Sequence, residues 1–221
     1  DYFTRALAFI PETDLHSRMD FLLKRIEVYK RVGDRARQLQ DIQLLKELAD
    51  RFGDNGWIAK GAVQFAHYHF TIGEYANSTV VAKKVLAGPA QDPSILMDAY
   101  SLAASSQLRL GNLDESMEIA RAGLRLAQES GLKDQEARTL SGMGLISIEQ
   151  TNLAQAMEYL QQSLRLARET SDRFVETTAW NNMGNAAGYM GDYSMARDCY
   201  ERCLLAFREQ GDRYGEGLIL G

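Results

Sequence analysis

The chain of 221 residues contains little proline (three), cysteine (two) or histidine (three). Alanine, leucine, glutamate, arginine and glutamine are abundant, and runs of valine, isoleucine and threonine are rare, so the composition predicts an all-helical protein. No apolar run approaches the ~20 residues that span a bilayer, and no signal peptide opens the chain, so we expect no membrane partner. Because the chain begins at Asp1 and not at Met, we expect it to be part of a longer protein.

Charge of one sign is not concentrated anywhere in the sequence. The formal net charge is −5, without a block of like charges. A nucleic-acid partner is not expected, because proteins that bind nucleic acids usually carry a basic stripe.

Cys199 and Cys203 stand four residues apart on one face of a predicted helix. We interpret them as core thiols of a cytoplasmic protein, the alternative being a disulfide in a secreted one.

Patterns that carry chemistry are also scarce. His67 and His69 are two residues apart, which turns them about 200° from each other on a helix, and His16 is remote. The sequence contains no phosphate-binding glycine loop and no serine paired with histidine in a known motif. We therefore expect no metal, no cofactor and no enzymatic activity. An all-helical phosphatase acting on a response regulator stays an alternative for which these residues supply no site.

The sequence repeats itself with a period of about 40 residues. Gly33-Asp34, Gly73-Glu74, Gly111-Asn112, Thr151-Asn152 and Gly191-Asp192 recur at spacings of 40, 38, 40 and 40. A second landmark recurs with the same period in "ESGLKDQEA" (129–137), "ETSDRFVET" (169–177) and "EQGDRYGEG" (209–217). Two alternating landmarks predict two helices in each repeat, each closed by a tight turn with Gly or Asn as the left-handed cap and Asp as the next N-cap.

Small residues recur at two positions of each repeat. They are Gly184, Gly144, Ala104 and Ala66 on the first helix, and Ala196, Ala156, Ser116 and Ser78 on the second. Since a small side chain lets two backbones come close, these positions predict tight packing between helices, with a large neighbour filling the space across the interface.

This pattern resembles the tetratricopeptide repeat. Trp180, Met183-Gly184, Ala187, Gly191-Asp192-Tyr193, Ala196, Tyr200 and Cys203 occupy the positions that the family motif expects. The 40-residue period resembles the long-helix variety of spindle-orientation adaptors, kinesin light chains and bacterial regulator sensor domains. The resemblance implies an all-α, right-handed superhelical solenoid of antiparallel helix pairs.

The repeats divide the whole chain, residues 1–221, as one array. Residues 1–14 are expected to be the tail of a preceding repeat, and residues 212–221 the start of a further one. Five repeats lie between them, at about 15–53, 54–92, 93–131, 132–171 and 172–211. Residues 88–94, which hold two of the three prolines, are interpreted as an irregular turn, with a hinge as the alternative. Because the last segment lacks its partner helix, we expect Leu218, Ile219 and Leu220 either to fray or to associate with another molecule.

The family geometry also implies which residues face a ligand, because the first helix of each pair lines the inner, concave wall. We call these inward positions the first-helix wall. In the second to fifth repeats they are Lys60, Val63, Gln64, His67, Phe70 and Thr71; Asp98, Ser101, Leu102, Ser105, Leu108 and Arg109; Arg138, Ser141, Gly142, Leu145, Ile148 and Glu149; and Thr178, Asn181, Asn182, Asn185, Gly188 and Tyr189.

Three asparagines on one helix need a reason, because asparagine is a mediocre helix former. An amide can both donate to and accept from the backbone of an extended peptide, and the family resemblance implies this role for Asn182 and Asn185. The alternative is a solvated side chain or a bond to a neighbouring repeat. The predicted peptide-binding residues are Asn181, Asn182, Asn185, Tyr189, Arg138, Ser141, Leu145, Arg109, Leu102, Gln64 and His67.

The wall therefore predicts a binding surface, with an apolar strip that includes Leu102 and Leu145 and with Arg109, Arg138 and Lys60 as isolated cations. Exposed apolar residues indicate a partner, although a closing superhelix could bury the same strip. The first hypothesis is a scaffold that binds a peptide or helix of a partner protein. The second is a ligand-gated sensor or regulatory domain of a signalling or transcription-regulating protein.

Overall fold

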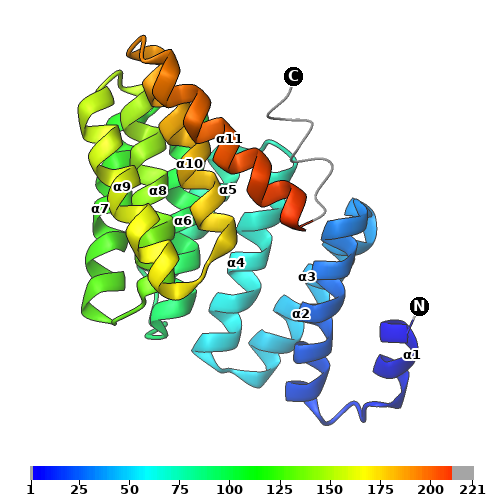
Figure 1. Cartoon of the computed structure of the whole chain (residues 1–221). Helices are drawn as coiled ribbons and strands as arrows, with labels where there is room; N and C mark the ends of the chain where they lie inside the picture. Colours follow the sequence, from blue (N-terminus) through cyan, green and yellow to red (C-terminus); the bar gives the residue numbers. More distant parts are fainter. Residues whose placement is uncertain (1, 211–221) are drawn as a thin grey trace. The chain divides into compact units, whose positions relative to one another are not determined.

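The computed structural model describes residues 2–210, which form helices connected by short turns and contain no strand (Figure 1). The predicted all-helical chain of paired helices is confirmed. The predicted segment 212–221, with Leu218, Ile219, Leu220 and the association expected of them, lies outside the described residues. The helices are α1 (Tyr2–Phe9), α2 (Leu15–Val32), α3 (Arg35–Phe52), α4 (Asn55–Thr71), α5 (Tyr75–Leu86), α6 (Pro93–Arg109), α7 (Leu113–Glu129), α8 (Lys133–Glu149), α9 (Leu153–Thr170), α10 (Arg173–Tyr189) and α11 (Tyr193–Gln210).

The helix ends follow the landmarks of the sequence. Gly33 ends α2 in the left-handed conformation, with φ at 76°, which a residue without Cβ adopts at little cost. The Asp34 carboxylate then accepts a hydrogen bond of 3.1 Å from the backbone N–H of Arg37 and caps α3. Asp14, Asp54, Asp172 and Asp192 make the same bond three residues ahead. Thus one Gly-Asp pair ends one helix and begins the next.

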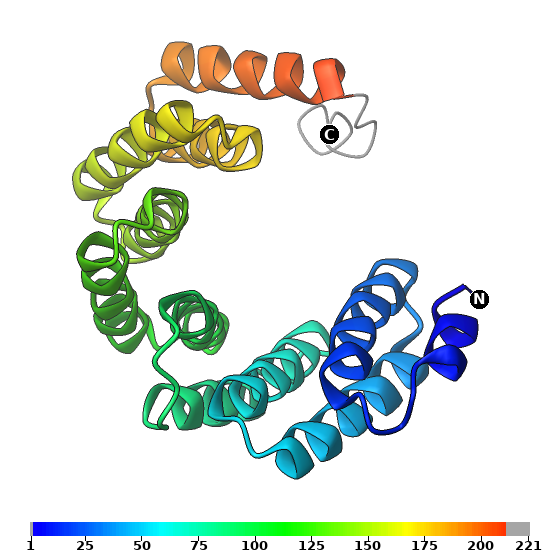
Figure 2. The same cartoon turned by 90° about the horizontal axis from the view of Figure 1, so that it is seen from below.

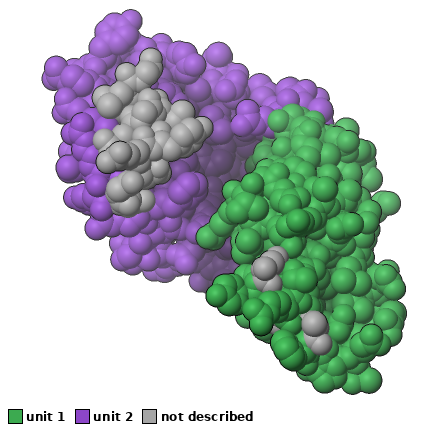
Figure 3. Space-filling view, turned by 90° about the vertical axis from the view of Figure 1, so that its right-hand side faces the viewer, with its two compact units in different colours: residues 1–106 green, residues 107–221 purple. Residues whose placement is uncertain are grey.

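The chain divides into two compact units, residues 1–106 and residues 107–221 (Figure 3). In the first unit α2 packs against α3, α3 against α4, and α4 against α5. In the second unit α8 packs against both α9 and α10, and α10 packs against α9 and α11 (Figure 2). A helix thus covers its own partner and part of the next pair, as expected where one pair cannot bury its apolar face alone. That the repeats form one array over residues 1–221 stays a prediction.

The glycines of the second unit mark the closest contacts between helices. A Cβ at Gly144 would lie 2.6 Å from Leu160, and a Cβ at Gly184 would lie 2.7 Å from the ring of Tyr200. Real Cβ atoms do not approach so closely, so only glycine permits this packing between α8 and α9 and between α10 and α11. The predicted role of the small residues is therefore confirmed at these two positions.

In the first helix pair, larger side chains occupy the positions of these close contacts. Ile26 and Ile42 stand at the positions that Gly184 and Tyr200 occupy later, and both are fully buried. Beside them the Arg25 guanidinium makes two hydrogen bonds of 2.6 Å to the Asp41 carboxylate, with both side chains largely buried. Breaking a buried pair of this kind leaves a charge without compensation, so α2 and α3 depend on both partners.

Helix α5 is shorter than the other second helices. It contains 12 residues and ends at Leu86, whereas α3, α7, α9 and α11 contain 17 or 18. Residues 87–92 form an irregular connection before α6, as the prolines at 89 and 93 predict. Beside the end of this short helix, a cavity reaches Asn55, Ile58 and Ala59 at the beginning of α4.

The two cysteines are free thiols of the core, as the sequence predicts. Sγ of Cys203 donates a hydrogen bond of 3.4 Å to the carbonyl of Thr177. Burial raises the pKa of Cys203 to about 12, so its thiol stays protonated at neutral pH.

The close contacts predict opposite effects of alanine at neighbouring glycines of one helix. We expect Gly184→Ala to lower the free energy of unfolding by about 1–3 kcal/mol, because the methyl group must displace the ring of Tyr200. Gly188→Ala is the matched control in α10, because no atom lies within 4 Å of its Cβ position. It should raise the free energy of unfolding by about 0.5–1 kcal/mol through helix propensity. Urea denaturation measures both, and a neutral Gly184→Ala would contradict the packing described here.

Candidate functional site

A cavity in the first unit lies against the first helices of three successive repeats. It has a volume of about 370 Å³ and is lined by Lys30 of α2, by Val63, Gln64, His67 and Phe70 of α4, and by Asp98, Ser101, Leu102 and Ser105 of α6. All of these except Lys30 belong to the first-helix wall as defined from the sequence. We call it the unit-1 wall cavity.

Polar and apolar side chains share the lining of this cavity. Val63 and Leu102 are buried, whereas Asp98 and Ser101, in the first half of α6, are exposed. Hydroxyl and amide groups such as those of Ser101, Ser105 and Gln64 can both donate and accept hydrogen bonds. The combination of an apolar floor with a few convergent polar groups is typical of binding sites.

His67 is held as a neutral ring at the cavity. The hydroxyl of Thr71 donates to the backbone carbonyl of His67 at 2.8 Å and lies 3.1 Å from Nδ1 of the same residue. Because a hydroxyl has one proton, Nδ1 must be the donor of the second bond, which leaves Nε2 as an acceptor. Burial, and then the positive charge of Lys30, lower the pKa of His67 below its ordinary value of 6.5.

Lys30 is the residue of this cavity that sequence reasoning missed. Its ammonium lies 3.3 Å from the carboxylate of Glu27, one turn earlier on α2. Lys30 stands 40 residues before Phe70, which is one period of the repeat, so extending the wall to the first repeat would have found it. It contributes positive charge to a lining that otherwise contains the carboxylate of Asp98.

The asparagines of α10 have different surroundings. Asn185 accepts a hydrogen bond of 2.7 Å from the hydroxyl of Tyr200, so its amide orients the ring that covers Gly184. Asn182 is only 6% exposed. Asn181 is half-buried, and Tyr189 is 73% exposed at the end of the helix.

A second cavity lies where α8 and α10 end. It has a volume of about 470 Å³ and is lined by Ile148, Glu149, Thr151, Leu153 and Tyr189. Three of these residues, Ile148, Glu149 and Tyr189, belong to the first-helix wall. We call it the unit-2 wall cavity. The carboxylate of Glu149 beside an exposed aromatic ring suits a cationic side chain of a ligand.

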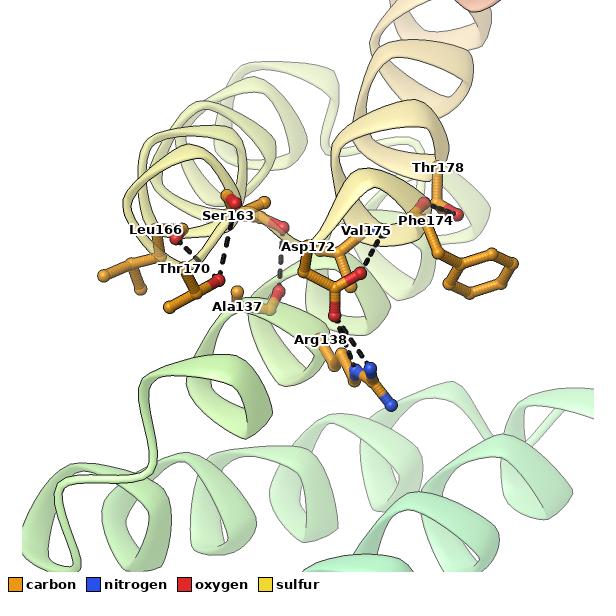
Figure 4. Close-up of polar contacts among 10 residues, drawn as sticks. Ala137, Arg138, Ser163, Leu166, Thr170, Asp172, Phe174, Val175 and Thr178 are labelled. Atoms are coloured by element: carbon orange, nitrogen blue, oxygen red, sulfur yellow. Dashed lines mark hydrogen bonds and ion pairs between the residues drawn. The ribbon is translucent and has the colours of Figure 1, made fainter. Parts of the chain in front are cut away.

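Arg138 is not the isolated cation that the sequence analysis expects. Its guanidinium lies 2.7 Å from the carboxylate of Asp172, and Figure 4 shows that this carboxylate also accepts from the N–H of Val175. Burial alone would raise the pKa of Asp172, but the hydrogen bonds from Arg138 and from the backbone hold it below its ordinary value. Arg138 therefore links α8 to the cap of α10, although its side chain stays 54% exposed.

The remaining predicted site residues differ in how much surface they offer. Ser141 is 5% exposed and Leu102 is 9% exposed, so a ligand can touch little of either side chain. Leu145 is half-buried, and Arg109 is exposed at the end of α6.

The described residues contain no group of three His, Cys, Asp or Glu side chains that could hold a metal ion. None of the helices described here has the length and apolarity required to cross a membrane.

Comparison with known proteins identifies the repeats. Residues 137–170 and 177–207 match models of the family described as tetratricopeptide repeat. A search of curated proteins finds no match.

Solved structures with the same fold share little sequence with the chain. A Rap protein complexed with competence and sporulation factor has a TM-score of 0.81 at 12% identity, over 98% of this chain and 60% of that one. Aspartyl phosphate phosphatase F from Bacillus subtilis has a TM-score of 0.75 at 15% identity, over 91% and 53%. A STAND protein with a tetratricopeptide repeat sensor from Pyrococcus horikoshii has a TM-score of 0.69 at 14% identity, over 99% and 37%. The chain thus spans between about a third and three fifths of these proteins.

The depressed pKa of His67 predicts a pH dependence of stability. His67 of the unfolded chain binds a proton near pH 6.5, whereas His67 of the folded chain binds it only at lower pH. The contribution of the neutral His67 to the free energy of unfolding is therefore fully present above about pH 6.5. This contribution is lost as the pH falls from there through the folded-state pKa. We expect His67→Asn, which keeps a donor for Thr71, to reduce the slope of unfolding free energy against pH between about 5 and 7.

Denaturant unfolding at a series of pH values measures this slope. His16→Asn, which removes an exposed imidazole from the same unit, is the matched control for the loss of a histidine. An unchanged slope for His67→Asn would contradict the neutral, buried ring.

Proposed function

We propose that the chain, in which residues 137–170 and 177–207 match tetratricopeptide repeats, is a protein–protein interaction scaffold whose first-helix wall binds an extended peptide segment of a partner protein. The observation that carries the proposal is the unit-1 wall cavity. Eight of its nine lining residues were assigned to the wall from repeat spacing and family resemblance.

The lining supports a division of roles between the peptide backbone and its side chains. Gln64, Ser101 and Ser105 bind the backbone, because amides and hydroxyls pair with any sequence. An apolar side chain of the peptide packs against Phe70, the half-buried apolar residue of the lining. An acidic group of the peptide pairs with Lys30, whose ammonium also contacts Glu27.

The unit-2 part of the wall offers polar groups of its own. Asn182 has an amide that can both donate and accept hydrogen bonds, although its side chain is only 6% exposed. A peptide backbone bound there pairs with this amide. Glu149 and Tyr189 then receive a basic side chain. Asn185 contributes its free N–H groups only, since its oxygen is bonded to Tyr200.

The comparisons are consistent with a peptide ligand. The Rap protein of similar fold is complexed with competence and sporulation factor. Because identity is only 12%, this likeness establishes the fold, and the ligand class of this chain is inferred from its own cavities.

Selection from a random peptide library tests the proposal. Peptides of roughly 12 residues, about 40 Å long when extended, are selected against the wild-type chain. We expect the double variant Gln64→Ala/Ser101→Ala to weaken peptides that bind the unit-1 wall about tenfold, since each lost hydrogen bond is worth about 0.5–1.5 kcal/mol. Asn181→Ala/Asn182→Ala should do the same for peptides that bind the unit-2 wall.

The control variant is Gln40→Ala/Gln43→Ala, which changes two exposed residues of the second helix α3. It should leave the dissociation constant unchanged, and circular dichroism verifies that every variant is folded. Selected peptides that bind both wall variants as tightly as the wild type would contradict the proposal.

The second candidate function is a ligand-gated sensor domain. It is favoured by the similar fold of the Pyrococcus horikoshii protein, whose repeats are described as a sensor. A sensor must change conformation when its ligand binds, whereas a plain scaffold need not. Small-angle X-ray scattering with a saturating selected peptide separates the two: a changed radius of gyration supports the sensor, and an unchanged one supports the scaffold.

A further inference from the structure

A third cavity lies away from the first-helix wall, beside the short helix α5. It has a volume of about 340 Å³ and is lined by residues of α3, α4 and α5 and of the following turn. On α4 it reaches Asn55, Ile58, Ala59 and Ala62, the part of that helix which a longer α5 would cover. We call it the α5 cavity. Its origin is therefore the early end of α5 at Leu86.

The lining of the α5 cavity is mainly apolar. Ala59, Val85 and Ala90 are buried, whereas Ile58 keeps 38% of its surface exposed, so the cavity can be reached from solvent. The remaining apolar lining residues are Ala62, Phe65, Val81 and Pro89. An apolar surface that stays accessible is a binding site for apolar groups.

Two lysines supply the charge of this cavity, and no carboxylate lines it. The stem of Lys46 passes over Gly61, where a Cβ would lie 3.2 Å from its Cγ, and its ammonium stands 4.4 Å from the centre of the Phe65 ring. Lys84 approaches from α5, where it is exposed. No carboxylate of the described residues lies within 4 Å of either ammonium.

We propose that the α5 cavity binds a small carboxylate with an apolar tail, about ten non-hydrogen atoms in all. The tail occupies the space between Ile58, Ala62 and Val81, and the carboxylate pairs with Lys84 and Lys46. The size of the ligand follows from the volume of the cavity, which is near the lower end of the roughly 300–1,000 Å³ of small-molecule sites. The negative charge of the ligand follows from the two lysines, because a cationic ligand would be repelled by them.

Titration with octanoate, followed by NMR of the backbone and methyl groups, tests the proposal. We expect saturable shifts of Ala62, Val81 and Val85 with a dissociation constant at or below about 1 mM. Octanol, which has the same tail without charge, should bind several-fold more weakly, and octylamine more weakly still. Absence of saturable shifts with octanoate, or equal binding of octylamine, would overturn the proposal.

Three variants distinguish the contribution of the lysine charge to binding from that of the apolar lining. Lys84→Gln should weaken octanoate about three- to tenfold and leave octanol unchanged. Lys24→Gln, an exposed lysine of α2 outside the lining, is the control and should leave both unchanged. Ala62→Phe should fill the cavity and abolish binding of both ligands. If it does not fold, the Lys84→Gln and octylamine results still decide the question.

The α5 cavity shares no lining residue with the unit-1 wall cavity. Binding of library-selected peptides should therefore survive Ala62→Phe, and octanoate binding should survive Gln64→Ala/Ser101→Ala. Either proposal can thus fail without the other. Shifts centred on Gln64 and His67 upon addition of octanoate would place the carboxylate in the wall and contradict the α5 site.

Discussion

The close approach of two helix backbones at a glycine is the contact on which the second unit depends. Leu160 packs onto Gly144 and Tyr200 packs onto Gly184, each at a distance that no Cβ would allow. These contacts fix how far each first helix stands from its second helix, and hence which of its residues remain on the outer face. Because the hydroxyl of Tyr200 also bonds to Asn185, the same contact orients a residue of the first-helix wall.

Polar contacts within and between repeats act on top of this packing. Lys133 pairs with Glu169 at 3.0 Å and Arg173 with Glu209 at 2.8 Å, each between the two helices of one repeat, whereas Arg138 pairs with Asp172 at the start of the next repeat. Exposed ion pairs contribute about 0–1 kcal/mol each, so these bonds orient the helices more than they stabilise them. The buried hydroxyl of Ser163 on α9, which donates to the carbonyl of Ala137 on α8 at 2.7 Å, joins the two helices of one pair within the core (Figure 4).

Most of the fold could be predicted from the sequence, because its causes are local or periodic. A Gly-Asp pair specifies a helix end wherever it stands, and the 40-residue period transfers each assignment to the next repeat. The unit-1 wall cavity could be anticipated for the same reason, except for Lys30, which lies in a repeat that departs from the motif. There a buried ion pair, Arg25 with Asp41, and two isoleucines replace the small residue and the aromatic ring.

What could not be predicted depends on side chains distant in sequence. Nothing near Arg138 indicates that Asp172 will pair with it, and the spacing of Asn185 does not reveal the hydroxyl of Tyr200. The α5 cavity was missed because it arises from residues that are absent, the last turns of a helix that ends at Leu86. A pattern search registers such a gap only as a repeat that is two residues short.

The central claim is that a peptide partner binds to the first-helix wall. Photo-crosslinking measures this most directly: p-benzoylphenylalanine replaces Ser101 on α6 in one protein and the exposed Ala76 on α5 in another, and each is irradiated with a library-selected peptide. The account predicts a crosslinked product from position 101 and none from position 76. Crosslinking from position 76 alone would place the ligand on the second helices and contradict it.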